Sequence, residues 1–292
     1  MDWTKVKYFF KLIRVEHTLF MLPFVYIGAF LAANTIPNTR LLILITLALF
    51  SGRVIAMTGN RVLDAEFDKK NARTMHWPIA SGKITKKEGY GIILIFTLLF
   101  FFIVYLINFT AFILSFVTIP VFLIYSLLKR YTWLSHVGLG IVEGIVPVGG
   151  WIAVTGNVYT LLSLPIVLTF LIAVLWLTGF DILYAIQDVS FDKKENLKSI
   201  PARFGVEKSI YISFFVHFAM GILITYFYFI YTNYFMLISI VLIWILILTE
   251  HLIVGKTHLE RINIAFFHVN VAIGFVFLIS VVGSVIINIH IL

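Results

Sequence analysis

The sequence contains no cysteine, which excludes disulfide bonds, thiol catalysis and cysteine-ligated metal sites. It also lacks the Gly-x-x-x-x-Gly-Lys-Ser/Thr loop of nucleoside triphosphatases and the Gly-x-Ser-x-Gly turn of hydrolases. His217 and His268, in the late apolar stretches, show neither His-x-x-His nor His-Glu-x-x-His spacing. No zinc site is therefore expected, and both histidines are interpreted as core groups.

Charge is scarce as well. Charged residues make up 12% of the 292-residue chain and hydrophobic residues 61%, whereas soluble domains carry about 25% charged residues. Nine apolar stretches reach the roughly 20 residues that a membrane-spanning helix needs. They lie near 15–34, 40–59, 88–107, 109–128, 136–155, 161–180, 208–230, 234–254 and 264–289. Lipid requires backbone polar groups to be satisfied internally, so the sequence predicts an all-α, polytopic membrane protein with one transmembrane domain over residues 1–292.

The basic residues indicate the orientation of this domain. The net charge is +8, and the lysines and arginines gather before the first stretch and after every second one. The loops on the other side contain only Arg40. The positive-inside rule then predicts a multi-pass protein of the cell's inner (cytoplasmic) membrane, with its N-terminus in the cytoplasm and its C-terminus outside. Nucleic acid is not expected as a partner, because no water-exposed domain carries these charges.

The few acidic residues follow a repeated pattern where apolar stretches meet basic loops. The two sets read Asn60-x-x-x-Asp64-x-x-x-Asp68 and Tyr184-x-x-x-Asp188-x-x-x-Asp192. A spacing of four places each set on one helical face, where paired carboxylates repel one another unless a cation lies between them. The pattern predicts Mg²⁺ binding and, through the metal, a phosphorylated ligand. The alternative is that each aspartate ends a helix and pairs with a nearby lysine.

The acidic sets belong to a longer internal repeat. Phe67-Asp68-Lys69-Lys70 recurs as Phe191-Asp192-Lys193-Lys194, and Pro78-x-x-x-Gly82 recurs as Pro201-x-x-x-Gly205. The repeated units span about 40–107 and 161–230, and a shared site is expected at their interface. The loops Lys69–Lys87 and Lys193–Lys208 are long, and short helices in them are expected to cap the carboxylates. The alternative is that basic cytoplasmic loops look alike through positive-inside bias alone.

Polar residues inside the apolar stretches extend the candidate site. Arg53 precedes Asn60 by seven residues, so it faces the same way at greater depth and needs an anionic partner. Glu143 lies within the fifth stretch and is expected to face a cavity or a partner. Asp181 precedes Asp188 by seven residues and is placed to extend the second acidic set. Arg14, Lys129 and Arg130 are read either as phosphate contacts or as interfacial anchors and positive-inside charge.

These motifs resemble those of the UbiA superfamily of intramembrane aromatic prenyltransferases over nearly the whole chain. Asn60 to Asp68 followed by Asn71-Ala72-Arg73-Thr74 is similar to the first family signature. Tyr184-Ala185-Ile186-Gln187-Asp188-x-x-x-Asp192 with Lys198 to Gly205 is similar to the second. Segments 16–24, 129–132 and 147–156 are similar to the 4-hydroxybenzoate polyprenyltransferase branch.

The resemblance implies nine helices around a central cavity with cytoplasmic caps, and two Mg²⁺ ions that bridge a polyprenyl diphosphate. It implies that Asn60, Asp64 and Asp68 hold one ion and that Asp188 and Asp192 hold the other. Asp64, Asp188 and Lys129 are the predicted catalytic residues. The predicted substrate-binding residues are Arg14, Arg53, Arg73, Arg130, Tyr184 and Glu143, among which Arg130 is the candidate for the acceptor carboxylate.

One position departs from the family pattern. The first loop usually carries a second arginine before its proline, whereas here Trp77 precedes Pro78. Arg73 is then expected to take more of the phosphate contact, or Lys83 to substitute for the missing arginine.

The expected reaction is electrophilic aromatic substitution on an aromatic acid acceptor inside the lipid bilayer, with Asp188 or the released diphosphate accepting the ring proton. The leading acceptor is 4-hydroxybenzoate, as in ubiquinone-type respiratory quinone biosynthesis, and the rival is a dihydroxynaphthoate of menaquinone biosynthesis. An inverted-repeat membrane transporter is the alternative of another class. It would place its polar groups near the membrane midplane, whereas these acids cluster at one face.

Overall fold

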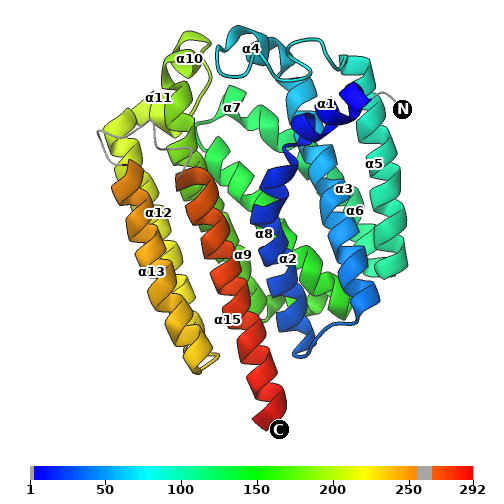
Figure 1. Ribbon diagram of the computed structural model, residues 1–292, viewed down its shortest axis with the longest axis vertical. Helices are drawn as coiled ribbons and strands as arrows, with labels where there is room; N and C mark the ends of the chain where they lie inside the picture. The colour runs from blue at the N-terminus through cyan, green and yellow to red at the C-terminus, as the bar shows by residue number, and fades with distance from the viewer. Residues whose placement is uncertain (1–2, 255–264, 292) are drawn as a thin grey trace.

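Nine helices that are long and apolar enough to cross a membrane form the body of the molecule, within residues 3–254 and 265–291 that the computed structural model describes (Figure 1). The main helices of these spans are α2 (Thr18–Ala33), α3 (Thr39–Leu63), α5 (Lys86–Ile107), α6 (Phe109–Ile124), α8 (Ser135–Thr155), α9 (Leu164–Ala185), α12 (Val206–Phe227), α13 (Tyr234–Val254) and α15 (Asn270–Ile291), and short helices described below extend some of them. The described residues contain no strand. The predicted fold class and the nine spans are confirmed, although the predicted start of the last span at residue 264 lies outside the described residues.

Short helices close one end of this bundle (Figure 1). They are α1 (Trp3–Ile13), η1 (Val15–His17), α4 (Ala65–Lys70), η2 (Tyr125–Leu127), α7 (Leu128–Tyr131), η4 (Ile186–Asp188), α10 (Val189–Lys194) and α11 (Ile200–Phe204). The turn η3 (Val158–Leu162) joins α8 to α9, and the π-helical segment η6 (Ala265–Val269) precedes α15. We call the end of the bundle that the first group of short helices closes the capped end. The chain begins near it, and α15 ends at the opposite end of the bundle.

The two predicted capping loops differ in structure. The second follows α10 and contains the short helix α11, as expected. The first follows α4 and runs through turns over residues 72–84 without a further helix before α5. Proline has no amide hydrogen to continue a helix, and Gly82 adopts a positive φ of 75°. Pro78 and Gly82 thus account for the turns that cover the bundle there.

Local capping groups fix where the helices begin after each turn. Thr85 and Glu88 form a capping box at the start of α5, in which Thr85 Oγ1 accepts from Glu88 N at 3.1 Å and Glu88 Oε2 accepts from Thr85 N at 2.8 Å. Asn108 starts α6, since its Oδ1 accepts from Ala111 N at 2.8 Å. These bonds satisfy amide hydrogens that a helix start leaves unpaired.

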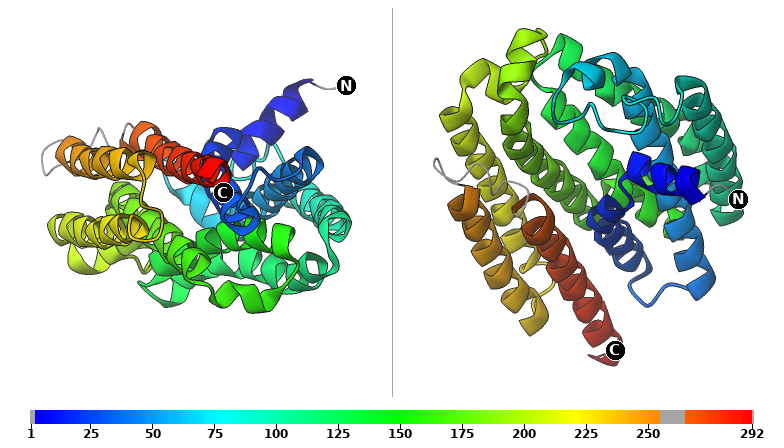
Figure 2. Two further views of the ribbon diagram at one scale, coloured as in Figure 1. Left: turned by 90° about the horizontal axis from the view of Figure 1, so that it is seen from below. Right: turned by 45° about the horizontal axis from the view of Figure 1, so that its top comes forward.

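The backbones of α2 and α8 touch at two glycines. A Cβ atom on Gly28 would lie 1.9 Å from the carbonyl oxygen of Pro147, and one on Gly150 would lie 2.0 Å from that of Val25. By contrast, a Cβ on Gly149 would meet nothing within 4 Å. Figure 2 shows α13 and α15 side by side at one edge of the molecule and α5 and α6 at the other. The glycine contacts therefore lie between these edges, where they hold the central helices that position the site.

Candidate functional site

A polar cavity of about 290 Å³ lies beneath the capped end, since residues of the short helices there are part of its lining. Residues of α2, α3, α8, α9 and the caps line it. Of the predicted site residues, those that line it are Arg14, Arg53, Asn60, Asp64, Asp68, Arg73, Lys129, Glu143, Tyr184, Asp188 and Asp192. Arg130 is not among the lining residues. The structure thus gathers into one cavity side chains that are spread over most of the chain.

Each acidic set spans a break in a helix, and the two breaks match. Asp64 separates α3 from α4 with φ −93° and ψ 4°, and Asp188 precedes α10 with φ −105° and ψ 4°. Both pairs of angles lie in the sparsely populated bridge region. The expectation of one continuous helical face was therefore too simple, although Asp68 and Asp192 still line the same cavity as their partners. The two breaks thus lie at matching positions of the acidic sets, and the internal repeat stays a prediction.

The first carboxylate pair is buried and surrounded by cations. Asp64 is 1% exposed, and its carboxylate lies 2.8 Å from Lys129 Nζ and 3.1 Å from Arg130 Nη2. Asp68 is also buried, with Arg61 Nη1 at 4.0 Å. Burial raises the pKa of the Asp68 carboxyl, and the positive charge of Arg61 acts in the opposite sense. Arg130 reaches Asp64 from outside the cavity lining and also donates to Leu63 O at 2.8 Å.

The second pair is anchored to the capping loops. Arg73 donates from both Nε and Nη2 to the carboxylate of Asp188, the first bond at 3.0 Å, in a two-point contact. Asn71 Nδ2 donates to Asp188 Oδ1 at 2.9 Å. Asp192 Oδ2 accepts from Ser199 Oγ at 2.7 Å. Asp64 and Asp188 therefore pair with arginines and one lysine from distant segments, rather than with the adjacent lysines of the alternative interpretation.

Tyr184 holds two of the predicted phosphate-binding arginines. Its hydroxyl accepts from Arg14 Nη1 at 3.2 Å and from Arg73 Nη1 at 3.0 Å. Arg14 adopts a left-handed backbone conformation, with φ 45° and ψ 63°, at the junction of α1 and η1. A non-glycine residue rarely adopts this conformation. The junction thus directs Arg14 into the cavity from the N-terminal segment.

Trp77 occupies the position at which the family pattern led us to expect arginine. The guanidinium carbon of Arg61 lies 3.3 Å from the centroid of the indole ring. Those of Arg73 and Arg14 lie 5.5 Å and 5.6 Å from it. Trp77 therefore forms cation–π contacts with three arginines, whereas the family pattern has an arginine at this position. Lys83 is not a lining residue, and its ammonium lies 5.1 Å from the Tyr8 ring.

The sequence analysis missed a histidine in the cavity wall. His136 Nε2 accepts from the backbone amide of Ile200 at 3.2 Å, so its Nδ1 carries the proton that is shared with Asp181 Oδ2 at 2.7 Å. Asp181 lines the same cavity as Asp188 and Asp192. Its partner is a histidine, which ties α8 to α9 and to the start of α11.

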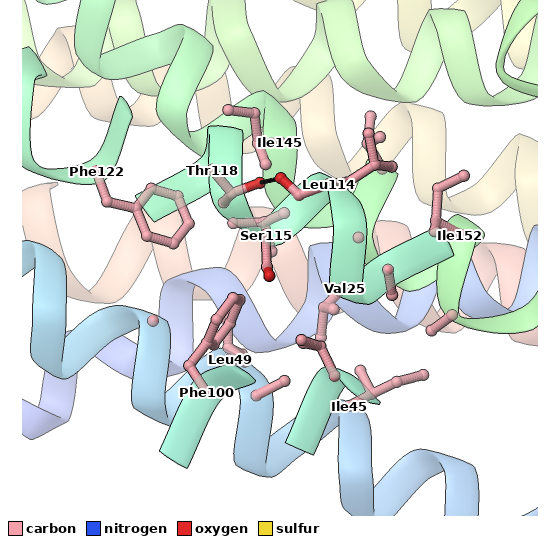
Figure 3. Close-up of a pocket in the computed structure, with 18 of the residues that line it drawn as sticks. Val25, Ile45, Leu49, Phe100, Leu114, Ser115, Thr118, Phe122, Ile145 and Ile152 are labelled. Carbon is pink, nitrogen blue, oxygen red and sulfur yellow. Dashed lines mark hydrogen bonds between the residues drawn. The ribbon is translucent and has the colours of Figure 1, made fainter. Parts of the chain in front are cut away.

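A second cavity, shown in Figure 3, has a volume of about 140 Å³ and shares lining residues with the polar one. The two share Met21, Arg53, Ala56 and Val142 in their walls. The remaining wall comes mainly from aliphatic and aromatic residues of α3, α5, α6 and α8, such as Phe100 and Phe122. Among its described lining residues Arg53 alone is charged. The site therefore has a polar compartment under the caps and an apolar one between the helices.

Two ionisable side chains at the border between the two cavities have atoms that form no hydrogen bond among the described residues. Glu143 is 2% exposed, and neither its Oε1 nor Arg53 Nε forms a hydrogen bond among the described residues. Within the part of the chain that the structure describes, Arg53 Nη1 donates to a weak acceptor, Met21 Sδ, at 3.7 Å. Unpaired buried polar atoms are costly unless a ligand satisfies them. The geometry thus offers one donor and one acceptor to a polar molecule bound next to the apolar cavity.

Comparison with known proteins identifies relatives of the chain. The model of the UbiA prenyltransferase family matches residues 21–272. The 4-hydroxybenzoate octaprenyltransferase of Vibrio campbellii is 29% identical over 267 residues, which cover 89% of each chain. The enzyme of the same name from Photobacterium profundum is 31% identical over 208 residues, covering 69% of this chain and 70% of the relative.

Solved structures share the fold. A UbiA homologue from Aeropyrum pernix superimposes with a TM-score of 0.83 at 28% identity, covering 95% of this chain and 98% of the homologue. A UbiA homologue from Archaeoglobus fulgidus, solved with DMAPP and Mg²⁺, gives a TM-score of 0.70 at 19% identity, covering 94% and 99%.

Proposed function

We propose a function from the premise that this chain belongs to the UbiA prenyltransferase family. It transfers a polyprenyl group from a polyprenyl diphosphate to 4-hydroxybenzoate in respiratory quinone biosynthesis. The observation that carries the proposal is the pair of acidic sets facing one polar cavity, ringed by arginines and a lysine, next to an apolar cavity. A diphosphate fits the first compartment and a hydrocarbon tail the second.

The polar compartment fits Mg²⁺. Carboxylate and amide oxygens are the ligands that this ion prefers, and its remaining positions are usually filled by water and substrate phosphates. Asn60, Asp64 and Asp68 would hold one ion, and Asp188 and Asp192 a second. Magnesium bound there would neutralise the negative charge that develops on the departing diphosphate.

The basic residues supply the rest of that neutralisation. Arg14, Arg73 and Lys129 line the cavity, and each is bonded to a residue of an acidic set. When a diphosphate enters, these cations are positioned to donate to its oxygens as the C–O bond breaks. Tyr184 and Trp77 keep two of the arginines in place.

The apolar cavity protects the prenyl group. Its walls exclude water, which would otherwise quench an allylic cation. The aromatic faces of Phe100 and Phe122 are among these walls and interact favourably with positive charge. Lodging the tail between α3, α5, α6 and α8 places the reactive carbon at the border between the compartments, beside Arg53.

Arg53 and Glu143 are the residues that we propose for the acceptor. Arg53 can neutralise the acceptor carboxylate, and Glu143 can accept a hydrogen bond from its hydroxyl group. Arg130, the earlier candidate for the carboxylate, contacts Asp64 and Leu63 from outside the cavity lining. We therefore favour Arg53 for that role. Proton removal from the ring falls to Asp188 or to the released diphosphate.

The names of the similar proteins favour 4-hydroxybenzoate over a dihydroxynaphthoate as acceptor. Membership of a prenyltransferase family argues against the transporter alternative. The protein has several membrane spans, and we propose the bacterial inner membrane as its location. The capped end would face the cytoplasm, as the basic loops at that end indicate.

The test is prenyl transfer by membranes that contain the chain, supplied with Mg²⁺, a polyprenyl diphosphate and either 4-hydroxybenzoate or 1,4-dihydroxy-6-naphthoate. Mass spectrometry should find the prenylated benzoate, and membranes with Asp64→Ala should form none. A product from the naphthoate alone would overturn the acceptor. No product from either acceptor, in protein shown to be folded, would overturn the proposed reaction.

A further inference from the structure

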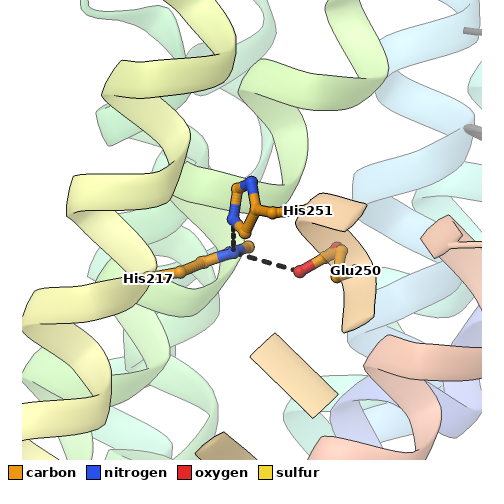
Figure 4. A group of neighbouring side chains, drawn as sticks. All are labelled: His217, Glu250 and His251. Atoms are coloured by element: carbon orange, nitrogen blue, oxygen red, sulfur yellow. Dashed lines mark hydrogen bonds and ion pairs between the residues drawn. The ribbon is translucent and has the colours of Figure 1, made fainter. Parts of the chain in front are cut away.

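Three metal-binding side chains meet away from both cavities, between α12 and α13 (Figure 4). His217 of α12 and Glu250 and His251 of α13 each offer a ligand atom, and these atoms lie within 4.8 Å of one another. His217 Nδ1 lies 3.1 Å from Glu250 Oε2 and 3.2 Å from His251 Nε2. We call these residues the His217 cluster. None of them lines the polar or the apolar cavity.

The cluster contains a buried carboxylate oxygen that lacks a hydrogen bond. Glu250 is 1% exposed and His217 is 0% exposed. Asn270 Nδ2 donates to Glu250 Oε1 at 2.7 Å, and Asn270 in turn accepts from Trp176 Nε1 at 2.7 Å. Apart from the contact with His217 Nδ1 at 3.1 Å, Glu250 Oε2 has no polar partner among the described residues. A buried carboxylate is costly unless a positive charge compensates it, and Oε2 points to the centre of the cluster.

The ring of His217 is oriented as a ligand. Its Nε2 lies 3.0 Å from the carbonyl oxygen of Trp176. A carbonyl only accepts, so Nε2 carries a hydrogen, and the neutral ring then presents the lone pair of Nδ1 to Glu250 and His251. Histidines that bind metals usually donate their other ring N–H to a backbone carbonyl or a carboxylate in this way. The tautomer required for coordination is thus set by the backbone of α9.

A cation satisfies this arrangement better than a single proton. A proton between His217 and His251 leaves Glu250 Oε2 without a partner, and a proton between His217 and Glu250 leaves the His251 nitrogen without one. A zinc ion lies about 2.0–2.2 Å from nitrogen and oxygen ligands, which places tetrahedral ligands roughly 3.3–3.6 Å apart. The distances of 3.1 Å and 3.2 Å from His217 Nδ1 are within a few tenths of an ångström of that geometry.

We propose that the His217 cluster binds a divalent transition-metal ion, with Zn²⁺ as the best match. Two imidazoles and one carboxylate suit zinc, whereas Mg²⁺ prefers oxygen ligands alone. The ion links α12 to α13 directly, and to α9 and α15 through the bonds made by Trp176 and Asn270. It is separate from the metal pair of the proposed reaction and serves to hold the last helices together.

Local spacing in the sequence could not reveal this site. His217 and the Glu250-His251 pair lie on different helices, so the ligands meet only when α12 and α13 pack. The expectation that His217 is a plain core group therefore missed two of its neighbours.

The test uses the purified full-length protein in detergent, stripped with chelator and then titrated with Zn²⁺ in excess Mg²⁺, which occupies the oxygen ligands of the polar cavity. We expect one tightly held zinc per chain and a zinc-dependent rise in Tm. Cobalt in the same site should give the visible absorption of a tetrahedral centre. His217→Ala and Glu250→Gln should lose the zinc and the absorption. His268→Ala should keep both, because His268 is exposed and is not the core group that the sequence led us to expect.

An additional variant should weaken zinc binding without removing a ligand. Asn270→Leu removes the donor that orients Glu250, and it should weaken zinc binding about 10–100-fold. Should the cluster variants not fold, X-ray absorption of the zinc-loaded wild type gives the answer, since imidazole nitrogen must appear in its coordination shell. A wild type that holds no zinc, a shell of oxygen alone, or full zinc retention in His217→Ala would overturn the proposal.

Discussion

Replacing Tyr184 with phenylalanine tests whether one hydroxyl organises the phosphate-binding arginines. The change removes the acceptor shared by Arg14 at 3.2 Å and Arg73 at 3.0 Å while leaving the ring in place. Hydrogen bonds to charged groups contribute about 1.5–3 kcal/mol each. The side chain of Arg73 is 28% exposed, so water replaces part of the lost interaction. We therefore expect a total loss of about 1–2 kcal/mol, discounted for this exposure.

That loss corresponds to a fall of about 5–30-fold in kcat/KM for the prenyl diphosphate. The assay is steady-state prenyl transfer by purified protein at saturating Mg²⁺ and aromatic acceptor. Tyr159→Phe is the matched control, because Tyr159 is 82% exposed and lies in the η3 turn, away from the caps. It should leave kcat/KM unchanged.

A double-mutant cycle identifies the route of the effect. If Tyr184 acts through Arg14, then Tyr184→Phe should cost less in an Arg14→Ala background than in the wild type. A Tyr184→Phe enzyme within twofold of the wild type would refute the reasoning. Strict additivity with Arg14→Ala would assign the hydroxyl's whole effect to a route other than Arg14.

Three further outcomes are expected. Asp64→Asn and Asp188→Asn should each lower turnover about 10³-fold, since charge neutralisation by metal contributes several kcal/mol; chelation should stop wild-type turnover and added Mg²⁺ should restore it. Trp77→Leu should raise the KM for the diphosphate about 2–30-fold, because each cation–π contact contributes about 0.5–2 kcal/mol; an unchanged KM would contradict the role assigned to the indole. Gly28→Ala should destabilise the protein by about 1–3 kcal/mol or more, because the added methyl group would collide with the backbone of α8. The measurement is a lower Tm, which Gly149→Ala should not show.

The fold could be predicted from the sequence because each span carries its own signal. A run of about 20 apolar residues in lipid has no alternative to a helix, whatever its neighbours do. The helix ends were harder to place. α3 continues to Leu63 and α9 to Ala185, beyond the apolar stretches that end near 59 and 180, because hydropathy stops at the first polar residue whereas the helix continues toward the caps.

The site was predicted where local spacing carries the information. Asp64 and Asp188 stand out because carboxylates are rare in this chain and recur in one pattern. Arg61, Trp77 and His136 were missed because each acquires its role from a residue distant in sequence or from a loop that folds over it. A positive-inside arginine and an interfacial tryptophan look ordinary until the caps bring them together.

The pairing of the cavity's aspartates with its own cations would make the proposed binding of metal and of diphosphate interdependent. Lys129 and Arg130 neutralise Asp64, and Arg73 neutralises Asp188. A metal that takes a carboxylate releases a cation for a phosphate, and a phosphate that takes a cation releases a carboxylate for a metal. Such coupling is reciprocal by thermodynamic necessity and typically amounts to about 1–3 kcal/mol. The cavity should therefore bind either ligand weakly alone and both ligands cooperatively, as an exchange of partners at nearly constant local charge.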